Sequence, residues 1–253
     1  MKSRYEAVMD GIALSSVSSN LIIRDIAHGV ANPAIETASI AKRNGSFPIN
    51  ERQNGASVAI TFELHIYSIA ERQRVCQEVQ RWAKGHILET NDREGQSLNV
   101  KCTQYPSISS ALKWRDPITM IFTAFEKPSW EEKTPSVVEV TGTSEESPLF
   151  VPGNAGKALV EVNIQPNATI ENITVSVGNT AIALTGIGAT TSDLVTIGYD
   201  EKGFLFIKKG NTSLMDKRSG SDDLLAECGV INTVSIESSA SATVTFTTRG
   251  LWM

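Results

Sequence analysis

The stretch SVAITFELHIY, residues 57–67, alternates apolar and polar side chains with a period of two. Its apolar positions are Val58, Ile60, Phe62, Leu64 and Ile66. A period of two is typical of a β-strand that buries one face. His65 falls on the polar side of this strand, which predicts a surface or boundary residue and not a ligand.

The chain continues as SIAERQRVCQEVQRWAKG, residues 68–85, and here the repeat becomes helical. The face at helical spacing consists of Ile69, Arg72, Val75, Cys76, Val79, Trp82 and Ala83. Ser68 suits the N-cap position and Gly85 suits the end of a helix. We therefore predict an amphipathic helix of about four turns directly after the strand.

Two more strands follow this helix in the sequence. LNVKCT, residues 98–103, places Leu98, Val100 and Cys102 on one face, and DPITMIFTAF, residues 116–125, is rich in β-branched and aromatic residues. The order strand, helix, strand, strand indicates an α+β unit. In such a unit the helix covers one face of a mainly antiparallel sheet.

A long polar segment, residues 39–55, precedes the opening strand and contains the steps Asn44-Gly45 and Asn54-Gly55. Asn-Gly favours tight turns because both residues tolerate positive backbone angles. We expect a protruding hairpin or an extended loop here, and long loops of this kind are usually functional or disordered.

The texture of the sequence changes near residue 134, where we place the boundary between domains 1–134 and 135–253. Prolines at 128, 135 and 148 bracket charged and Ser/Thr-rich residues, and we expect the linker at residues 131–136. Beyond it, seven short runs alternate with turn residues, which predicts a β-sandwich. These runs are KALVEVNI, ENITVSV, TAIALT, DLVTIGYD, GFLFIKK, TVSIES and TVTFTTRG. The expected fold is mainly β with one α-helix: an α+β sandwich-like domain, then a β-sandwich.

Composition excludes several classes of protein. The chain has 253 residues, of which 41% are hydrophobic, and its 23 Lys and Arg against 28 Asp and Glu give a net charge of −5. No basic stripe tracks a phosphate backbone, so we expect no specific nucleic-acid recognition. No signal-peptide core and no apolar run of about 20 residues is present, so we expect synthesis in the cytoplasm and no membrane partner. Three widely spaced cysteines, Cys76, Cys102 and Cys228, predict buried thiols and no disulfide framework.

No sequence motif indicates a catalytic site, a cofactor-binding site or a metal-binding site. His28, His65 and His86 are far apart and lack spaced partners. The carboxylate pairs at residues 131–132, 145–146 and 222–223 fall in segments that we interpret as loops. LTGIGATT, residues 184–191, lacks the third glycine of a dinucleotide fingerprint, and we interpret it as a turn between strands. We therefore assign no catalytic, cofactor-binding or metal-binding residue and expect a protein that is not an enzyme.

The order of these segments resembles a known family. The runs are GIALSSVSSNLIIRDIAHG, ITFELHIYSIAERQRVCQEVQRWAKG, LNVKCT and ITMIFTAFEKPSWEE. They are similar to the amino-terminal domain of the distal tail (Dit) proteins of long-tailed bacteriophages. The matching features are a helix with a late tryptophan, Trp82, and an aromatic-rich strand followed by Pro and Trp, here Phe122, Phe125, Pro128 and Trp130. The second half, with its GFLFI hairpin and the ending TVTFTTRGLWM, resembles the galectin-like sandwich of the same proteins.

The resemblance implies a structural hub at the tip of a phage tail. Amino-terminal domains would form a homohexameric ring that continues the tail tube, and the ring would connect the tube protein to a tail-tip lysin, fibre or receptor-binding protein. The expected location is the virion tail tip, after synthesis in the host cytoplasm. Ring closure needs heterologous interfaces, and we expect residues 39–55 to reach a neighbouring subunit or the tube. Two alternatives stay open: a carbohydrate-binding module, and a subunit of a related injection machine.

Overall fold

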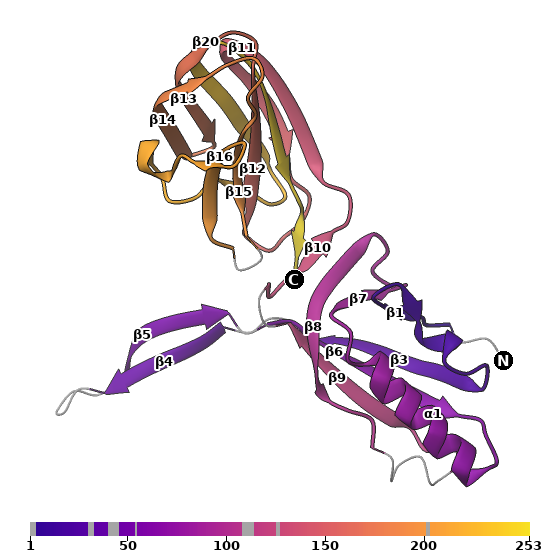
Figure 1. The fold of residues 1–253 in the computed structure, drawn as a ribbon. Helices are drawn as coiled ribbons and strands as arrows, with labels where there is room; N and C mark the ends of the chain where they lie inside the picture. The colour runs from indigo at the N-terminus through magenta and orange to yellow at the C-terminus, as the bar shows by residue number, and fades with distance from the viewer. Residues whose placement is uncertain are drawn as a thin grey trace. The chain divides into compact units, whose positions relative to one another are not determined.

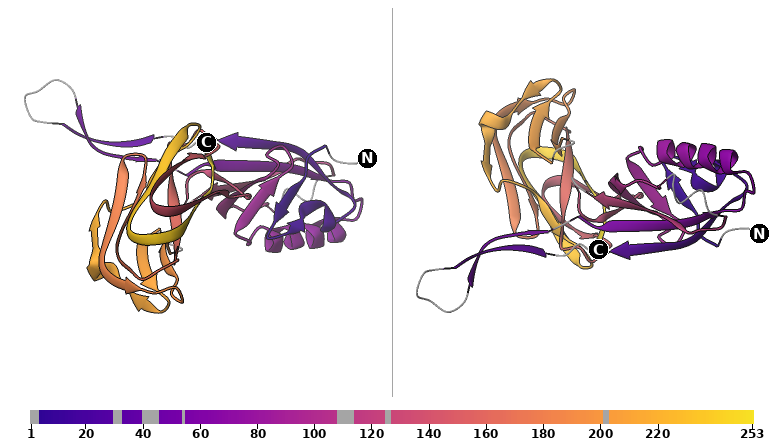
Figure 2. Two further views of the ribbon diagram at one scale, coloured as in Figure 1. Left: turned by 90° about the horizontal axis from the view of Figure 1, so that it is seen from above. Right: turned by 90° about the horizontal axis from the view of Figure 1, so that it is seen from below.

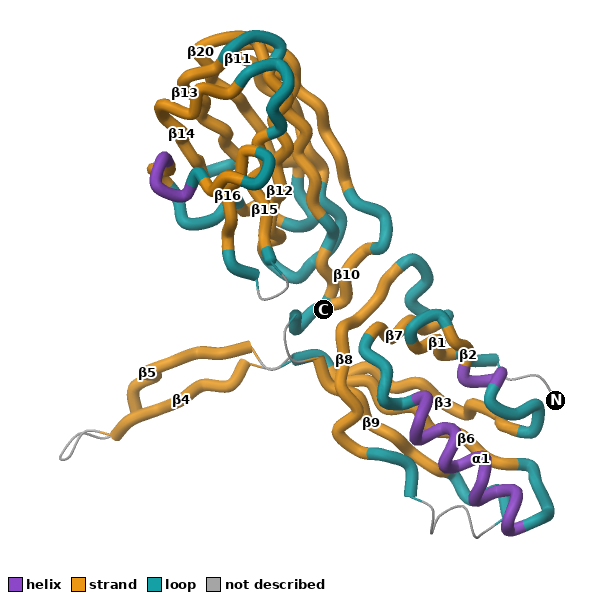
Figure 3. The backbone as a smooth tube through the Cα atoms, viewed as in Figure 1, coloured by secondary structure: helices purple, strands orange, loops and turns teal. Residues whose placement is uncertain are grey.

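A computed structural model describes residues 4–29, 33–39, 46–53, 55–107, 114–124, 127–200 and 203–253 (Figure 1). The chain divides into two compact units, Met1–Glu131 together with Met253, and Glu132–Trp252. The boundary lies close to residue 134, where the change in sequence texture occurs. Strands dominate the described residues and α1 (Ile69–Trp82) is the single α-helix among them (Figure 3). The expected class, mainly β with one helix, is confirmed.

The first unit is built on an antiparallel sheet with the strand order β2-β1-β7-β8-β9-β6-β3. Its strands are β1 (Ala7–Met9), β2 (Ile12–Ala13), β3 (Leu21–Gly29), β6 (Ser57–Leu64), β7 (Ile87–Thr90), β8 (Gln96–Gln104) and β9 (Ile118–Ala124). A short 3-10 helix, η1 (Leu14–Ser16), follows β2, and β10 (Trp130–Glu132) pairs with β8 at the unit boundary.

Helix α1 covers one face of this sheet (Figures 1 and 2). The Ser68 hydroxyl accepts a hydrogen bond from the Glu71 N–H at 3.4 Å, as an N-cap does. The helix buries Arg72, Val75, Cys76, Val79 and Trp82. In β6 the buried residues alternate as predicted, because one face of the strand lies beneath the helix. The prediction that Ile69 belongs to the buried face is wrong. Ile69 is the first residue of α1 and is 53% exposed.

Between β3 and β6 the chain forms a hairpin of β4 (Pro33–Ser39) and β5 (Ser46–Gln53). Of the two structures expected for residues 39–55, the hairpin is therefore found, and its first strand begins earlier than the polar segment suggested. Asn44, Gly45 and Asn54 lie outside the described residues.

The second unit is a β-sandwich in which one sheet folds over on itself. Its strands are β11 (Ser136–Phe150), β12 (Lys157–Pro166), β13 (Ile170–Val177), β14 (Thr180–Ala189), β15 (Val195–Tyr199), β16 (Leu205–Lys209), β17 (Thr212–Ser213), β18 (Arg218–Gly220), β19 (Leu225–Glu227) and β20 (Ile231–Thr248), with the 3-10 helix η3 (Met215–Lys217). The unit also contains β21 (Leu251–Trp252), which is not part of this sheet. β20 pairs with β12 through residues 242–248 and with β13 through residues 234–238. β11 follows β20 through both parts, so these two strands run from one layer into the other.

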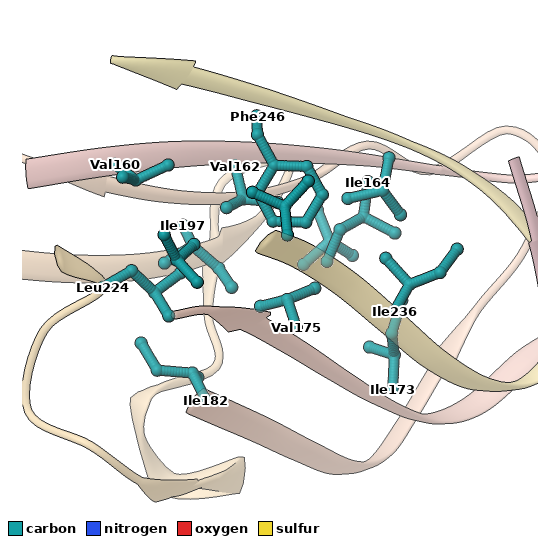
Figure 4. Close-up of a cluster of buried hydrophobic side chains, with 14 of the residues drawn as sticks. Val160, Val162, Ile164, Ile173, Val175, Ile182, Ile197, Leu224, Ile236 and Phe246 are labelled. Atoms are coloured by element: carbon teal, nitrogen blue, oxygen red, sulfur yellow. The ribbon is translucent and has the colours of Figure 1, made fainter. Parts of the chain in front are cut away.

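A single apolar core fills the space between the two layers. Val162, Ile164, Val175, Ile236 and Phe246 point into it from three strands, β12, β13 and β20 (Figure 4). Phe246 is fully buried. Because alternate residues of each strand face this core, the outer faces of both layers are left polar, which is the pattern that the Thr/Val-rich runs predicted.

The structure corrects four expectations for this half. Residues 136–150 form one long strand, although Pro148 suggested a break; proline is tolerated because β11 is an edge strand and needs no ladder N–H there. Glu145 and Glu146 therefore lie in a strand and not in a loop, and Glu131 and Glu132 likewise lie in β10. TVSIES and TVTFTTRG belong to the single strand β20. Gly186 and Gly188 lie inside β14, where positive φ angles of 63° and 50° accompany a register shift opposite β13, so LTGIGATT is not a turn between strands.

Candidate assembly surfaces

The β4–β5 hairpin leaves the sheet where two paired strands end. Gly29, the last residue of β3, lies opposite Ser57, the first residue of β6. A side chain at Gly29 would overlap the Ser57 hydroxyl, and one at Gly55 would overlap the Ala124 carbonyl oxygen. At Gly55 the close neighbour is backbone, so only glycine fits there, whereas at Gly29 the Ser57 hydroxyl could rotate away. The hairpin is an insertion at a tightly packed point of the sheet.

The sheet face opposite α1 is polar and open in the described residues. Its central positions in β6 and β9 are half-exposed. Hydroxyl pairs connect neighbouring strands, with Oγ1–Oγ1 distances of 2.9 Å for Thr61 and Thr119 and 3.2 Å for Thr103 and Thr123. Small and hydroxyl-bearing side chains can stay in contact with water, so this face does not need to be buried against another surface.

One ion-pair cluster lies on this open face. The guanidinium of Arg24 donates to the Glu63 carboxylate at 2.7 Å, and His65 Nε2 lies 3.2 Å from the same carboxylate oxygen. The hydrogen bond from Arg24 lowers the pKa of Glu63, against partial burial, and His65 adds to the effect. His65 thus has a carboxylate partner on the polar face where the sequence placed it.

The two units differ in how their long edge strands are protected. β3 ends the first sheet and is nine residues long, with a register shift between Ile23 and Asp25. β11 ends the second sheet and carries Pro148 together with exposed glutamates at 139, 145 and 146. Proline and charge on an edge discourage pairing with another chain. The edge of β3 has fewer of these features and is better suited to strand addition.

An exposed aromatic stack lies at the end of β6 and before β9. The rings of Tyr67 and Trp114 stack with centroids 5.2 Å apart, and the Arg115 guanidinium lies 4.4 Å from the Trp114 centroid. Tyr67 is 84% exposed and Trp114 is 47% exposed. Tyr, Trp and Arg are the residues most enriched at the centres of protein interfaces. Periodicity did not reveal this pair, because both residues lie outside regular elements.

The residues with possible chemistry are dispersed. His28 contacts Asp92, His65 contacts Glu63, and the backbone N–H of His86 donates to the Asp10 carboxylate. In the part of the chain that the structure describes, no three His, Cys, Asp or Glu side chains could hold a metal ion together. No helix of the described residues is long and apolar enough to cross a membrane.

The three thiols are poor nucleophiles at neutral pH. Burial raises the pKa of Cys76 and of Cys228, and it raises that of Cys102 to about 11. A raised pKa keeps each group as the thiol, whereas the thiolate is the reactive form. Cys76 is fully buried on α1, as predicted, and Cys102 and Cys228 are half-buried.

The aromatic rings of the second unit are mostly engaged within it. The Phe206 ring lies against Gly198, and Lys208 Nζ lies 4.6 Å from its centroid. Trp252 donates to the Glu132 carboxylate at 2.8 Å. Phe150 and Phe204 are exposed, but the first lies in the layer of β13 and the second precedes β16 in the layer of β12. These two rings therefore do not form a common platform on which a sugar could stack.

Comparison with known proteins extends the structural description. No family model and no curated protein sequence matches the chain. Among solved structures it is similar to the SPP1 Dit (gp 19.1) protein, described as a paradigm of the hub adsorption apparatus in phages infecting Gram-positive bacteria. That match covers 96% of this chain and 98% of the other at 10% identity, with a TM-score of 0.70. Two structures of the phage P2 baseplate in its activated conformation, with Ca and with Sr, match at 8% identity over 97% of each chain, with TM-scores of 0.47 and 0.46. The chain has the fold of a distal tail protein.

Proposed function

We propose that this chain is the distal tail protein of a long-tailed bacteriophage, a structural and non-catalytic hub at the tip of the tail. The observation that carries the proposal is the likeness to the SPP1 Dit hub protein, which extends over both units and nearly the full length of each chain. A fold shared by a single domain would say little about function. Here the likeness covers 96% of this chain, and so it includes both of its units.

The first unit forms a homohexameric ring that continues the lumen of the tail tube. Its sheet supports this role because one face is covered by α1 and the other is polar, half-exposed and rich in hydroxyl groups. Such a face suits a water-filled channel. A closed ring needs two different surfaces on each subunit that fit each other after rotation, and the edge strands β2 and β3 at opposite ends of the sheet offer two such surfaces.

The β4–β5 hairpin reaches a neighbouring subunit or the tube protein. Its two strands pair with each other and with no other strand in the described residues, so within one subunit they belong to neither large sheet. Deleting residues 41–54 tests this role. We expect the variant to fold but to give defective rings or non-infectious particles, and normal rings with infectious particles would exclude it.

The ring connects the tube protein above to a tail-tip lysin, fibre or receptor-binding protein below. The protein is made in the host cytoplasm and ends in the virion tail tip. An origin in a related injection machine is the nearest alternative. Neighbouring genes separate the two, because a tape-measure gene upstream and a lysin or fibre gene downstream belong to a phage tail.

Carbohydrate binding by the second unit is the weaker alternative, since its rings are engaged or lie in different layers. Saturable binding in a glycan array or in isothermal titration would reverse this order.

The test of the hub role is the mass of the purified protein by light scattering after size exclusion, followed by negative-stain imaging. We expect a six-fold ring, or smaller oligomers that combine into one. A strict monomer at every concentration, together with absence of the protein from purified tails, would contradict the proposal.

A further inference from the structure

A compact polar cluster sits at the end of β3, where the β4–β5 hairpin leaves the sheet. His28, the next-to-last residue of β3, places Nε2 2.7 Å from the Asp92 Oδ2 atom in the turn between β7 and β8. The two residues are 64 positions apart in sequence, and β8, the strand that follows Asp92, is separated from β3 by β9 and β6 in the sheet. This contact therefore ties the edge strand to a turn that joins two strands not adjacent to it.

The cluster also includes the strand that leads to the second unit. The His28 ring packs edge-on against Trp130, the first residue of β10, with centroids 5.3 Å apart. The guanidinium of Arg93 lies 5.2 Å from the Trp130 centroid and donates to the Met253 carbonyl at 3.2 Å. Trp130 is 1% exposed. The imidazole of His28, which lies at the root of the hairpin, thus contacts the start of the strand that leads to the second unit.

The surroundings of His28 make this arrangement specific. Its side chain is 18% exposed and its Nδ1 atom is buried without a hydrogen-bond partner in the described residues. The hydrogen bond at Nε2 is therefore the polar contact that holds the ring in place. A surface histidine that could turn freely in water would not be constrained in this way.

We propose that His28, Asp92 and Trp130 form a latch that couples the root of the β4–β5 hairpin to strand β10. When the latch is closed, the end of β3 and the start of β10 are held as one body. When it is open, both are released while the α1-covered core of the sheet stays folded. With the latch closed, a force or contact on the hairpin would be transmitted to β10, the strand that leads to the second unit. This inference concerns the chain itself and holds whether or not the protein is a tail hub.

The test is amide hydrogen exchange followed by mass spectrometry on the full chain, comparing wild type with His28→Ala. We expect exchange to rise about tenfold in peptides covering the end of β3 and in peptides covering β10, as loss of one charge-assisted hydrogen bond implies. Peptides of α1 and of β13 should keep their wild-type rates. The proposal is overturned if β10 is unaffected while β3 exchanges faster.

Arg24→Ala is the matched control, because Arg24 lies on the same strand and loses an ion pair with Glu63 that is not part of the latch. If Arg24→Ala accelerates exchange in β10 to the same extent, the effect is general fraying of β3 and the latch does not exist.

A double-mutant cycle supplies a second criterion. With His28→Ala and Asp92→Ala, the double variant should exchange no faster than the more affected single variant, because both substitutions open the same latch. Fully additive effects would contradict the coupling. If His28→Ala does not fold by circular dichroism, Asp92→Ala alone makes the comparison, because it removes the same hydrogen bond and leaves the His28 ring in place.

Discussion

The indole Nε1 of Trp82 donates a hydrogen bond to the carbonyl oxygen of Ile12 at 2.7 Å. The last turn of α1 is thereby fixed to β2, an edge strand of the first sheet. The same ring packs edge-on against Phe122 of β9, with centroids 6.0 Å apart. One side chain thus connects the helix to the edge and to the middle of the sheet.

Two substitutions of Trp82 should measure the contributions of the hydrogen bond and of the ring packing separately. Trp82→Phe keeps most of the apolar contact and leaves the Ile12 carbonyl without its donor, so we expect a loss of about 1 kcal/mol. Trp82→Ala also leaves a cavity, and we expect a loss of about 3–5 kcal/mol. Urea denaturation followed by circular dichroism measures both. Equal losses for the two variants would show that packing against Phe122 contributes little.

Arg72 should be essential for the connection between β6 and α1. Its side chain is 3% exposed, and Nη1 donates to the carbonyls of Ile66 and Tyr67 at 2.6 Å and 2.9 Å. Arg72→Met removes the donors and leaves buried carbonyls, so we expect a loss of about 2–4 kcal/mol in the free energy of unfolding.

Arg74→Ala is the control for Arg72, because Arg74 lies on the same helix and makes an exposed ion pair with Glu78. We expect that variant to stay within about 0.5 kcal/mol of wild type. Similar losses at positions 72 and 74 would mean that the buried hydrogen bonds of Arg72 contribute no more to stability than the exposed ion pair of Arg74.

Gly55→Ala should destabilise the root of the hairpin by steric overlap. A Cβ atom at this position would meet the backbone carbonyl of Ala124, which cannot turn aside as a flexible side chain could. We expect a loss of about 3 kcal/mol. Gly11→Ala is the comparison, since its φ is +81° and nothing lies within 4 Å of the added atom, and backbone strain alone should cost about 1–2 kcal/mol. A milder effect at Gly55 than at Gly11, by thermal unfolding, would contradict the close approach.

The strand and helix at residues 57–82 could be predicted because burial gives each a clear period. In β6 every second residue is buried, and in α1 the buried residues recur at helical spacing. β11 shows why other elements could not be predicted. Of its residues only Val140 and Leu149 are buried, so the strand has no apolar alternation, and Pro148 argues against it unless the strand is known to lie at an edge.

The candidate surfaces were harder to foresee than the fold. The pairs Tyr67–Trp114 and His28–Asp92 join residues far apart in the chain. Their contacts depend on strand order and on the curvature of the sheet, which no local pattern encodes.

Acid should weaken the first unit partly through Glu63. The hydrogen bond from Arg24 holds the pKa of Glu63 below its ordinary value, so the folded state binds the proton less readily than the unfolded state. This contribution is present above the unfolded pKa of about 4.3 and is lost as the pH falls through the lower, folded pKa. The free energy of unfolding, measured from pH 7 to pH 3, should therefore fall less steeply in Glu63→Gln than in wild type. Parallel curves would show that the ion pair with Arg24 contributes nothing.

Alkali should weaken the second unit through Tyr199. Its hydroxyl accepts a hydrogen bond from the Leu224 N–H at 2.9 Å, and burial raises its pKa to about 12. The unfolded tyrosine ionises near pH 10, so the unfolded state loses its proton first and stability falls as the pH rises above that value. Tyr199→Phe should cost about 1–2 kcal/mol at pH 8, because the Leu224 donor is left without an acceptor. Between pH 9 and pH 11 the difference between the two proteins should shrink. A difference that stays constant over this range would show that Tyr199 ionises equally well in the folded and unfolded chains.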